Sequence, residues 1–247
     1  MFLEGFLGLI TGTLLGLLGG GGSIIAVPIL VYVLGLQAKA AIGTSLVIVA
    51  LASFFAVLPH WRRNYVSLRI ALLFGASGAI GSYLGGVLAG GISDQIQLIM
   101  FASIMTLVGI LMLTAGKNNE ASRPQHSHQL SIVLAAGLGA GLLTGLLGVG
   151  GGFIIVPALM LILGLPMKQA VGTSLLVIAM NSLVGATAYA SHISFKGSVL
   201  PFAIGTILSA PVAGHFAHYV EQGKLKVGFA LALLLLSAWM LIKQFIG

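Results

Sequence analysis

The chain of 247 residues lacks cysteine and is very poor in charge, with 11 Lys or Arg and only 4 Asp or Glu. The absence of cysteine excludes disulfides, thiolate catalysis and Cys-ligated metals. A soluble domain is charged at about a quarter of its residues, whereas only 6% of this chain is charged. Such a composition cannot cover a water-exposed surface, so soluble enzymes, DNA-binding modules and disordered tails are excluded.

The few charges are mostly cations, which give a formal net charge of +7 and a pI near 10.0. These cations are thinly spread, with no basic cluster beyond Arg62 and Arg63. In a membrane protein, cations mark the cytoplasmic loops rather than a polyanion partner. We therefore expect a multi-pass integral membrane protein that contacts the lipid bilayer and binds no nucleic acid.

Hydrophobic residues make up 58% of the chain, and the uncharged intervals between charged residues measure the expected spans. A spanning helix needs about 20 apolar residues. Five of the intervals, such as those from Lys39 to Arg62 and from Arg69 to Asp94, are slightly longer than this, and each predicts one pass. The fold class that follows is an all-α polytopic membrane protein with about eight spans.

Two intervals are longer and carry a glycine cluster in the middle. Glu4 and Lys39 enclose 34 uncharged residues with Gly19–Gly22 between them, and the interval before Lys168 holds Gly148 and Gly150–Gly152. A straight helix of that length would reach about 50 Å, beyond a hydrocarbon core of about 30 Å. Each glycine costs about 1 kcal/mol relative to Ala in a helix. We predict two short helices that meet at a glycine break, as a re-entrant hairpin or as two tilted passes.

The second half of the chain repeats the first. Gly16–Phe54 and Gly145–Leu183 are identical at 21 of 39 positions, including Pro28 with Pro157 and a Gly-Thr-Ser triplet in each copy. Chance similarity of apolar segments would not place Pro, Lys and this triplet in register. The predicted organisation is a first transmembrane repeat over residues 1–115, a polar cytoplasmic linker over 116–129, and a second repeat over 130–247.

The distribution of cations favours inverted repeats. If each glycine-joined pair enters and leaves on one side, the two sides of the membrane hold eight and three cations. If each pair is a single kinked span, the repeats are parallel and the split is seven to four. The positive-inside rule favours the larger asymmetry. Inverted repeats are a common transporter plan, with the substrate at the repeat interface near the midplane.

The glycine breaks are the first candidate site. The amides that begin the second short helix have no intrahelical partner, and a helix N-terminus carries partial positive charge that suits an anion. Helix packing is the alternative role of small residues in membranes, and it explains the four-residue ladder of Gly8, Gly12, Gly16 and Gly20 better. The predicted anion cradle consists of Gly21, Gly22, Ser23, Gly150, Gly151 and Gly152.

Hydroxyl and amide side chains add to the candidate substrate-binding residues. Thr44 and Ser45 in one repeat correspond to Thr173 and Ser174 in the other, and these hydroxyls can donate to a substrate oxygen. Local bonds to backbone carbonyls are the alternative. Asn181 is the one amide well inside a span, where it can bind substrate asymmetrically or hold helices together.

Carboxylates are missing from the predicted membrane interior, because all four acids fall at interval ends or in the linker. Cation transport and a carboxylate-driven pump are therefore disfavoured. Neither HExxH nor a P-loop is present, so we expect no enzyme activity, no metal site and no cofactor. The histidines, His60 among them, are expected to anchor the chain at the membrane interface.

The repeated blocks GLLGGGGSIIAVPIL (Gly16–Leu30) and GLLGVGGGFIIVPAL (Gly145–Leu159), each followed by Gly-Thr-Ser, resemble the sulfite exporter TauE/SafE family of membrane permeases. The resemblance covers both halves and implies transport of small sulfur-containing anions such as sulfite, thiosulfate or organosulfonates across the inner (plasma) membrane. The first block departs from the second at Gly20 and Ser23, which leaves open whether both sites bind equally.

The predicted function is a permease or exporter for a small anion, working by alternating access with the anion held at glycine-rich helix N-termini. An anion channel with re-entrant glycine loops and a non-transporting membrane scaffold stay open as alternatives, as does a homo-oligomer.

Overall fold

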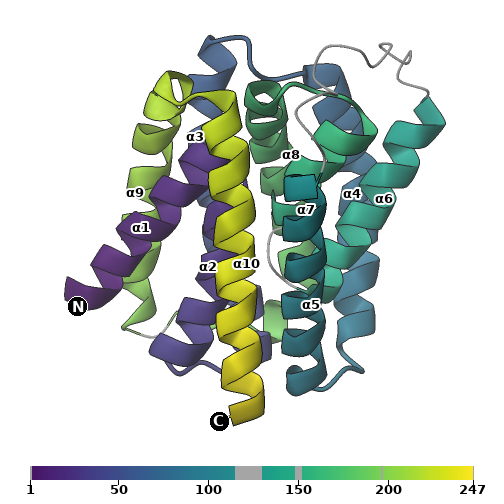
Figure 1. The fold of residues 1–247 in the computed structure, drawn as a ribbon. Helices are drawn as coiled ribbons and strands as arrows, with labels where there is room; N and C mark the ends of the chain where they lie inside the picture. The colour runs from purple at the N-terminus through teal and green to yellow at the C-terminus, as the bar shows by residue number, and fades with distance from the viewer. Residues whose placement is uncertain (1, 115–129, 148–151, 196, 247) are drawn as a thin grey trace.

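The computed structural model describes residues 2–114, 130–147, 152–195 and 197–246, and this part of the chain is helical throughout, with no strand (Figure 1). The first half contains α1 (Phe2–Leu18), α2 (Gly21–Pro28), α3 (Ala38–Arg62), α4 (Leu68–Ala89) and α5 (Asp94–Thr114). The second half contains α6 (Leu130–Leu147), α7 (Gly152–Pro157), α8 (Met167–Ala188), α9 (Val199–Phe216) and α10 (Gln222–Ile246).

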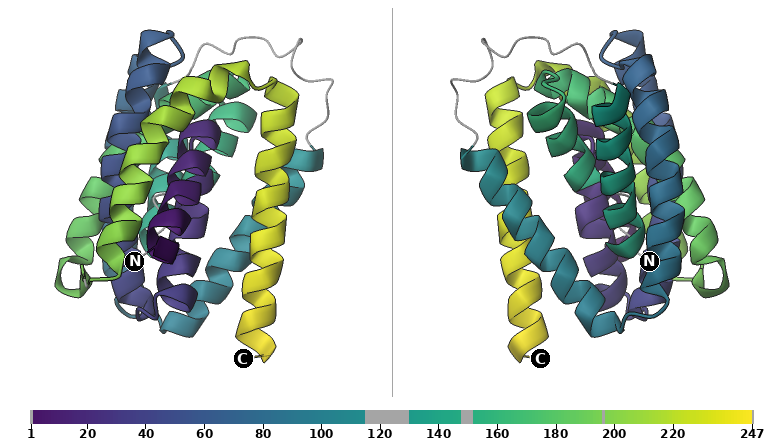
Figure 2. Two further views of the ribbon diagram at one scale, coloured as in Figure 1. Left: turned by 90° about the vertical axis from the view of Figure 1, so that its left-hand side faces the viewer. Right: turned by 90° about the vertical axis from the view of Figure 1, so that its right-hand side faces the viewer.

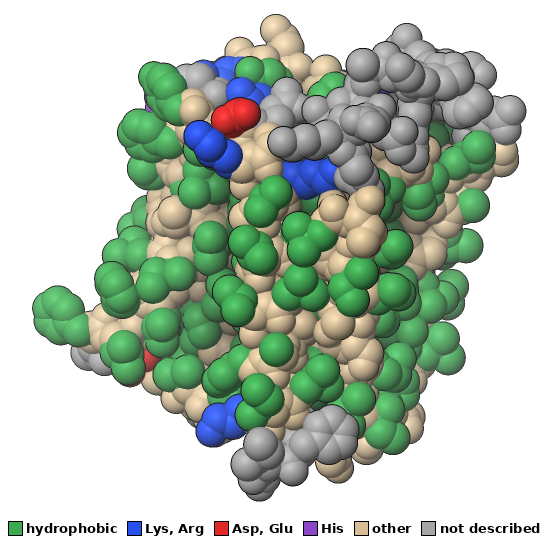
Figure 3. Space-filling view, in the orientation of Figure 1, with side chains coloured by type: hydrophobic (Ala, Val, Ile, Leu, Met, Phe, Trp, Pro, Cys, Tyr) green, Lys and Arg blue, Asp and Glu red, His purple; other side chains and the backbone are tan. Residues whose placement is uncertain are grey.

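Seven of the described helices are long and apolar enough to cross a membrane, namely α3, α4, α5, α6, α8, α9 and most of α10. Three shorter apolar helices accompany them, covering Phe2–Leu18, Gly21–Val33 and Gly152–Ile162. Large hydrophobic side chains are exposed along the outer faces of the helices, and they cover the middle of the molecule in Figure 3. The polytopic all-α fold class is therefore confirmed.

The two helices around each glycine cluster are unequal in length, which corrects the expectation of two short helices. α1 has 17 residues and α6 has 18, so the first member of each pair is nearly a full span. Only the second member is short, because a proline ends it. Pro28 and Pro157 close α2 and α7, and each is followed by a five-residue π-helical turn, η1 (Ile29–Val33) and η3 (Ala158–Ile162). Proline has no N–H to donate, and the wider π turn accommodates that gap.

The two halves run in opposite directions through the bundle. α3 and α8 pack against each other. Gly43 near the start of α3 lies against Tyr189 at the end of α8, while Gly172 near the start of α8 lies against Tyr65 and His60 at the end of α3. The helices are therefore antiparallel, and α2 and α7, which precede them in the chain, lead toward opposite ends of the molecule. An inverted duplication predicts this arrangement, and the duplication itself remains a prediction from the sequence.

The glycine ladder of α1 is a packing surface. A Cβ added at Gly8, Gly12 or Gly16 would meet the backbone of α9, and the two helices lie side by side in the left view of Figure 2. Gly81 and Gly85 of α4 meet the backbone of α6 in the same way. The packing role that we expected for this ladder thus applies to its first three members. Small residues let membrane helices approach closely, where van der Waals contact stabilises the pair.

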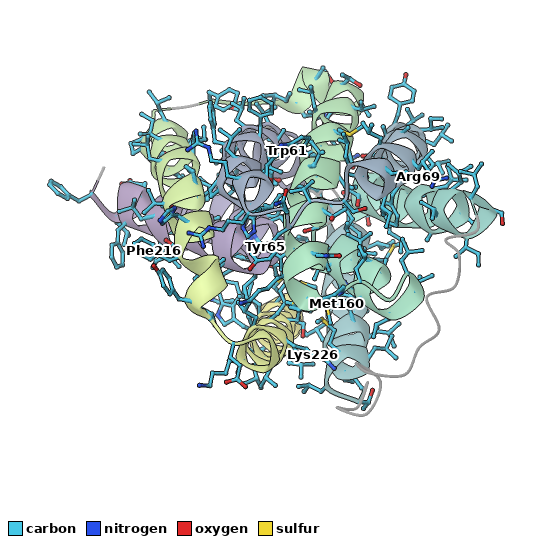
Figure 4. All side chains as sticks on the ribbon, turned by 90° about the horizontal axis from the view of Figure 1, so that it is seen from above. Trp61, Tyr65, Arg69, Met160, Phe216 and Lys226 are labelled. Atoms are coloured by element: carbon cyan, nitrogen blue, oxygen red, sulfur yellow. The ribbon has the colours of Figure 1, made fainter. Side chains whose placement is uncertain are left out.

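The cations of the described residues gather at one end of the bundle. The end of α3 and the starts of α4, α8 and α10 meet there, and they bring together Arg62, Arg63, Arg69, Lys168, Lys224 and Lys226. Lys226 and Arg69 are labelled in the view of this end in Figure 4. At the opposite end, the described cations are Lys39 and Lys243. The positive-inside rule predicts that the cation-rich end faces the cytoplasm.

This orientation predicts opposite labelling of Lys39 and Lys168, which occupy the same place in the two repeated blocks, at the starts of α3 and α8. Because the chain has no cysteine, Lys39→Cys and Lys168→Cys each introduce a single reactive thiol. We expect a membrane-impermeant maleimide to label Lys39→Cys in intact cells and Lys168→Cys only in inside-out vesicles. Labelling of both from the same side would contradict the inverted arrangement.

Candidate functional site

The first glycine break forms a tight reversal between α1 and α2. Gly19 has a φ of +67°, a left-handed conformation that favours glycine. Gly20 precedes α2, and no side chain caps the helix there. The Ser23 hydroxyl instead donates to the carbonyl of Gly20 over 2.7 Å. The first-turn amides of α2 thus lack an intrahelical partner and a side-chain cap, and the residues Gly21, Gly22 and Ser23 are buried.

The starts of α2 and α7 touch each other inside the bundle. A Cβ added at Gly20 would overlap the backbone of Gly152, and one added at Gly152 would overlap Gly20. Gly152 is the first residue of the helical segment Gly152–Ile162 and is buried. Each helix start carries partial positive charge, so two such ends in contact repel each other and favour a negative charge between them. Gly150 and Gly151, also predicted in this site, lie outside the described residues.

Packing explains part of what the glycines do here. A Cβ at Gly22 would overlap the Thr11 carbonyl of α1, and one at Gly21 would come within 2.8 Å of Leu18. Glycine is thus required at position 22 for α2 to lie against α1, whether or not its amide binds a ligand. Close packing was expected for Gly20, whereas for Gly22 it adds to the anion-binding role predicted from the sequence, which stays a prediction.

Ser174 lies at the same break. Its hydroxyl is 2.8 Å from the Gly19 carbonyl and 2.8 Å from the Val171 carbonyl of its own helix, and its side chain is buried. α8 is thereby tied to the reversal between α1 and α2. Ser45, the equivalent residue of α3, donates to the Ile42 carbonyl over 2.9 Å.

Thr44 and Thr173 are not brought to this break. Thr44 accepts a hydrogen bond from the Ser194 amide over 3.0 Å, and Thr173 accepts one from the Ser67 amide over 3.0 Å. Ser194 follows α8 and Ser67 precedes α4, so each threonine fixes a connection that belongs to the other half of the chain. These bonds are long-range, unlike the local bonds to backbone carbonyls that we kept as the alternative, and they favour a structural role for the two threonines.

Thr173→Val is accordingly expected to lower stability without changing the anion concentration at half-maximal transport. A buried hydrogen bond of this kind contributes about 1 kcal/mol. Thr106→Val is the matched control, because Thr106 bonds only the Ala102 carbonyl of its own helix. A thermal unfolding curve and a transport titration of both variants would test this. A changed half-saturation in Thr173→Val with normal unfolding would show that the threonine contacts substrate.

Asn181 is the most unusual buried group of the described residues. Its side chain is fully buried, and neither Oδ1 nor Nδ2 has a hydrogen-bond partner. The amide lies against Gly78 of α4, where an added Cβ would crowd Nδ2. Ser53 and Ser182, at equivalent positions of α3 and α8, are also buried hydroxyls without a partner. A buried polar group without a partner costs about 1–3 kcal/mol, so such groups on α3 and α8 suggest a ligand or a function.

His60 and Tyr189 are residues whose role the sequence did not reveal. They occupy equivalent positions in the two halves, and each contacts the carbonyl of an equivalent glycine. Nε2 of His60 lies 3.2 Å from the Gly16 oxygen, and the Tyr189 hydroxyl donates to Gly145 over 2.8 Å. The expectation that His60 anchors the chain at the membrane interface is wrong, because only 3% of it is exposed. Extending the repeat alignment to positions 60 and 189 would have paired the two residues.

No group of three or more His, Cys, Asp or Glu that could hold a metal ion occurs among the described residues. The described acids are Glu4 near the start of α1, Asp94 at the start of α5 and Glu221 just before α10. None of these described acids lies on α2 or α7, the helices whose starts meet at Gly20 and Gly152. This environment can accept an anion without electrostatic competition from a fixed negative charge.

Comparison with known proteins identifies the relatives of this chain. The model of the family described as "Sulfite exporter TauE/SafE" matches residues 5–240. A "Probable membrane transporter protein" of Xylella fastidiosa is 38% identical over 187 residues, which cover 74% of this chain and 71% of the relative. The "Probable membrane transporter protein YdhB" of Bacillus subtilis is 29% identical over 220 residues, covering 87% of this chain and 89% of the relative.

No solved structure matches the chain. The family match spans both glycine breaks, six of the seven candidate spans, most of the seventh, and the cation-rich end. The chain is a multi-pass membrane protein that belongs to the sulfite exporter TauE/SafE family of membrane transporters.

Proposed function

We propose that this transporter moves a small anion, of the class of sulfur oxyanions or organosulfonates, and that it holds the anion where α2 and α7 begin. The observation that supports this proposal most directly is the contact between Gly20 and Gly152. It brings together the N-termini of two helices that run from this contact toward opposite ends of the bundle. A doubly charged oxyanion between them would accept hydrogen bonds from free amides and offset the repulsion of two positive ends.

The substrate class rests on chemistry and on the family. Pyramidal or tetrahedral oxyanions present several acceptor oxygens at once, which suits two converging sets of amides. The hydroxyls of Ser23 and Ser174 lie beside the break, bonded to the carbonyls of Gly20 and Gly19, and each hydroxyl can rotate to donate to an oxyanion instead. The family description names a sulfite exporter, which supports sulfur as the central atom of the transported oxyanion.

The transport mechanism that we propose is alternating access by movement of one half of the chain against the other. Gly19, Gly20 and Gly152 are in close contact in this structure, so the two helix starts would have to separate to admit the anion. Among the described residues, the contacts that join the halves at this point include Gly20 against Gly152, Gly19 against Val171, and the Ser174 hydroxyl with the Gly19 carbonyl. Rocking of the halves could break these contacts on one side at a time, as in other inverted-repeat transporters.

A flux assay in proteoliposomes tests this function. We expect saturable uptake of at least one anion from a panel of sulfite, thiosulfate, sulfate, taurine and methanesulfonate, and no saturable uptake of chloride or potassium. Saturation with unlabelled competitor would support alternating access. A linear flux with single-channel currents would show a channel instead, and no flux of any panel member by folded protein would favour a scaffold.

A further inference from the structure

A groove between α3 and α9 opens at the cation-rich end of the molecule, away from the α2 and α7 contact. Its volume is about 400 Å³. Phe55, Leu58, Pro59 and Pro211 form its apolar wall. The guanidinium-bearing residues Arg62 and Arg63 and the imidazole of His215 complete it. Phe216 and Trp61, next to the groove residues in sequence, are labelled at this end in Figure 4.

The prolines help to explain why a hollow forms here. Pro59 lies inside α3 and Pro211 inside α9, and both line the groove. Proline removes a helical hydrogen bond, and its ring clashes with the preceding turn, which displaces the backbone. Two packed helices that are each disturbed at the same level cannot fill the space between them as regular helices do.

The charge of the groove is not neutralised within the described part of the protein. Neither Arg62 nor Arg63 pairs with an acidic side chain there, and none of the groove residues is an acid. The described acid at this end, Glu221, is 3.4 Å from Lys224 at the start of α10. Two guanidinium groups that share an acid-free hollow suit a phosphate, to which each can donate two hydrogen bonds.

The apolar side of the groove continues toward the lipid. Phe55 and Leu58 are 42% and 50% exposed, and further toward the bundle centre Leu51, Leu208 and Val212 are exposed by 45% to 63%. These side chains form a track on α3 and α9 that only hydrocarbon chains would cover in a membrane. A free anion would leave this track unused, whereas a phospholipid would fill the track and the charged hollow together.

We propose that the groove between α3 and α9 binds an anionic phospholipid of the cytoplasmic leaflet, with the phosphate at Arg62 and Arg63 and an acyl chain along Phe55 and Leu58. Basic hollows between membrane helices on the cytoplasmic side are suited to such headgroups. The lipid would hold α3 and α9 together at the end where Pro59 and Pro211 interrupt them. This site is separate from the proposed anion path and does not depend on which substrate is carried.

Native mass spectrometry of the purified protein, titrated with phosphatidylglycerol, tests the proposal. We expect a saturable phosphatidylglycerol adduct and much weaker binding of phosphatidylcholine. Free glycerol 3-phosphate should neither bind nor compete at the same concentration. The double variant Arg62→Gln/Arg63→Gln should bind phosphatidylglycerol about 30-fold more weakly. It removes two cations, and each cation near an anionic membrane surface strengthens binding about fivefold.

The matched control is Arg69→Gln/Lys224→Gln, which removes the same charge from the same end of the molecule outside the groove. It should bind phosphatidylglycerol like the wild type. Phe55→Ala keeps both cations, removes part of the acyl wall, and should weaken binding several-fold. The proposal is overturned by equal binding of the two phospholipids to the wild type, by equal losses in the two double variants, or by glycerol 3-phosphate binding as tightly as the lipid. The comparison of the two phospholipids uses only the wild-type protein, so it tests the proposal even if a variant fails to fold.

Discussion

Replacing Gly20 with alanine is expected to reduce transport at least about tenfold and to destabilise the protein by about 1–3 kcal/mol, the range for an overpacked core. The new methyl group would overlap the backbone of Gly152, and a backbone cannot rotate away as a side chain can. The φ of Gly20 is −175°, an extended conformation open to any residue. The expected effect is therefore steric, and it forces apart the two helix starts that would hold the anion.

Gly139→Ala is the matched control for this substitution. Gly139 lies inside α6, and a Cβ added there would meet nothing within 4 Å. Alanine is favoured over glycine in a helix by about 1 kcal/mol, so Gly139→Ala should transport normally and unfold at an equal or higher temperature. Uptake kinetics and thermal unfolding of both variants are the measurements. Normal uptake by Gly20→Ala would show that the contact between α2 and α7 is not part of the transport path.

Replacing Asn181 with alanine is expected to separate transport from stability. The amide is fully buried without a partner, so its removal relieves a desolvation penalty while it leaves a small cavity. The two contributions oppose each other, and we expect the free energy of unfolding to change by less than about 1 kcal/mol. If the amide contacts the anion in another step of the cycle, uptake should fall about tenfold or more, in line with the loss of a hydrogen bond to a charged group.

Alanine is a suitable replacement, because Ala52 occupies the equivalent position in the first half. Thr206→Val serves as the control, since Thr206 is equally buried and bonds only the Phe202 carbonyl of its own helix. We expect Thr206→Val to take up anions at the wild-type rate. Asn181 would be a structural residue after all if its replacement lowered stability by several kcal/mol and left uptake per folded molecule unchanged.

The sequence predicted the membrane fold well, because its signals are local. Uncharged intervals measure helix length directly, and the glycine clusters mark where a helix must end. The unequal lengths of α1 and α2 were harder to predict. The position of the break within the interval depends on Gly19, which is left-handed, and on Pro28, which ends α2.

The site was predicted less completely, because its contacts join residues that are far apart in the chain. Thr44 looked like Ser45 in the sequence, yet Thr44 bonds Ser194 in the other half of the chain. Likewise, His60 is buried in contact with the backbone carbonyl of Gly16 in α1. Which hydroxyl faces a helix break and which faces a connection depends on how the two halves pack, and no local pattern encodes that.

The central claim is that the anion lies where α2 and α7 begin. A structure of the protein with selenite, an analogue of sulfite, tests it most directly, because anomalous scattering locates selenium without ambiguity. We predict a selenium peak beside the amides of Gly21, Gly22 or Gly152, placed so that the selenite oxygens lie within hydrogen-bonding distance of these amides. A selenium peak elsewhere in the bundle, with none at this contact, in a protein that transports selenite would contradict the account.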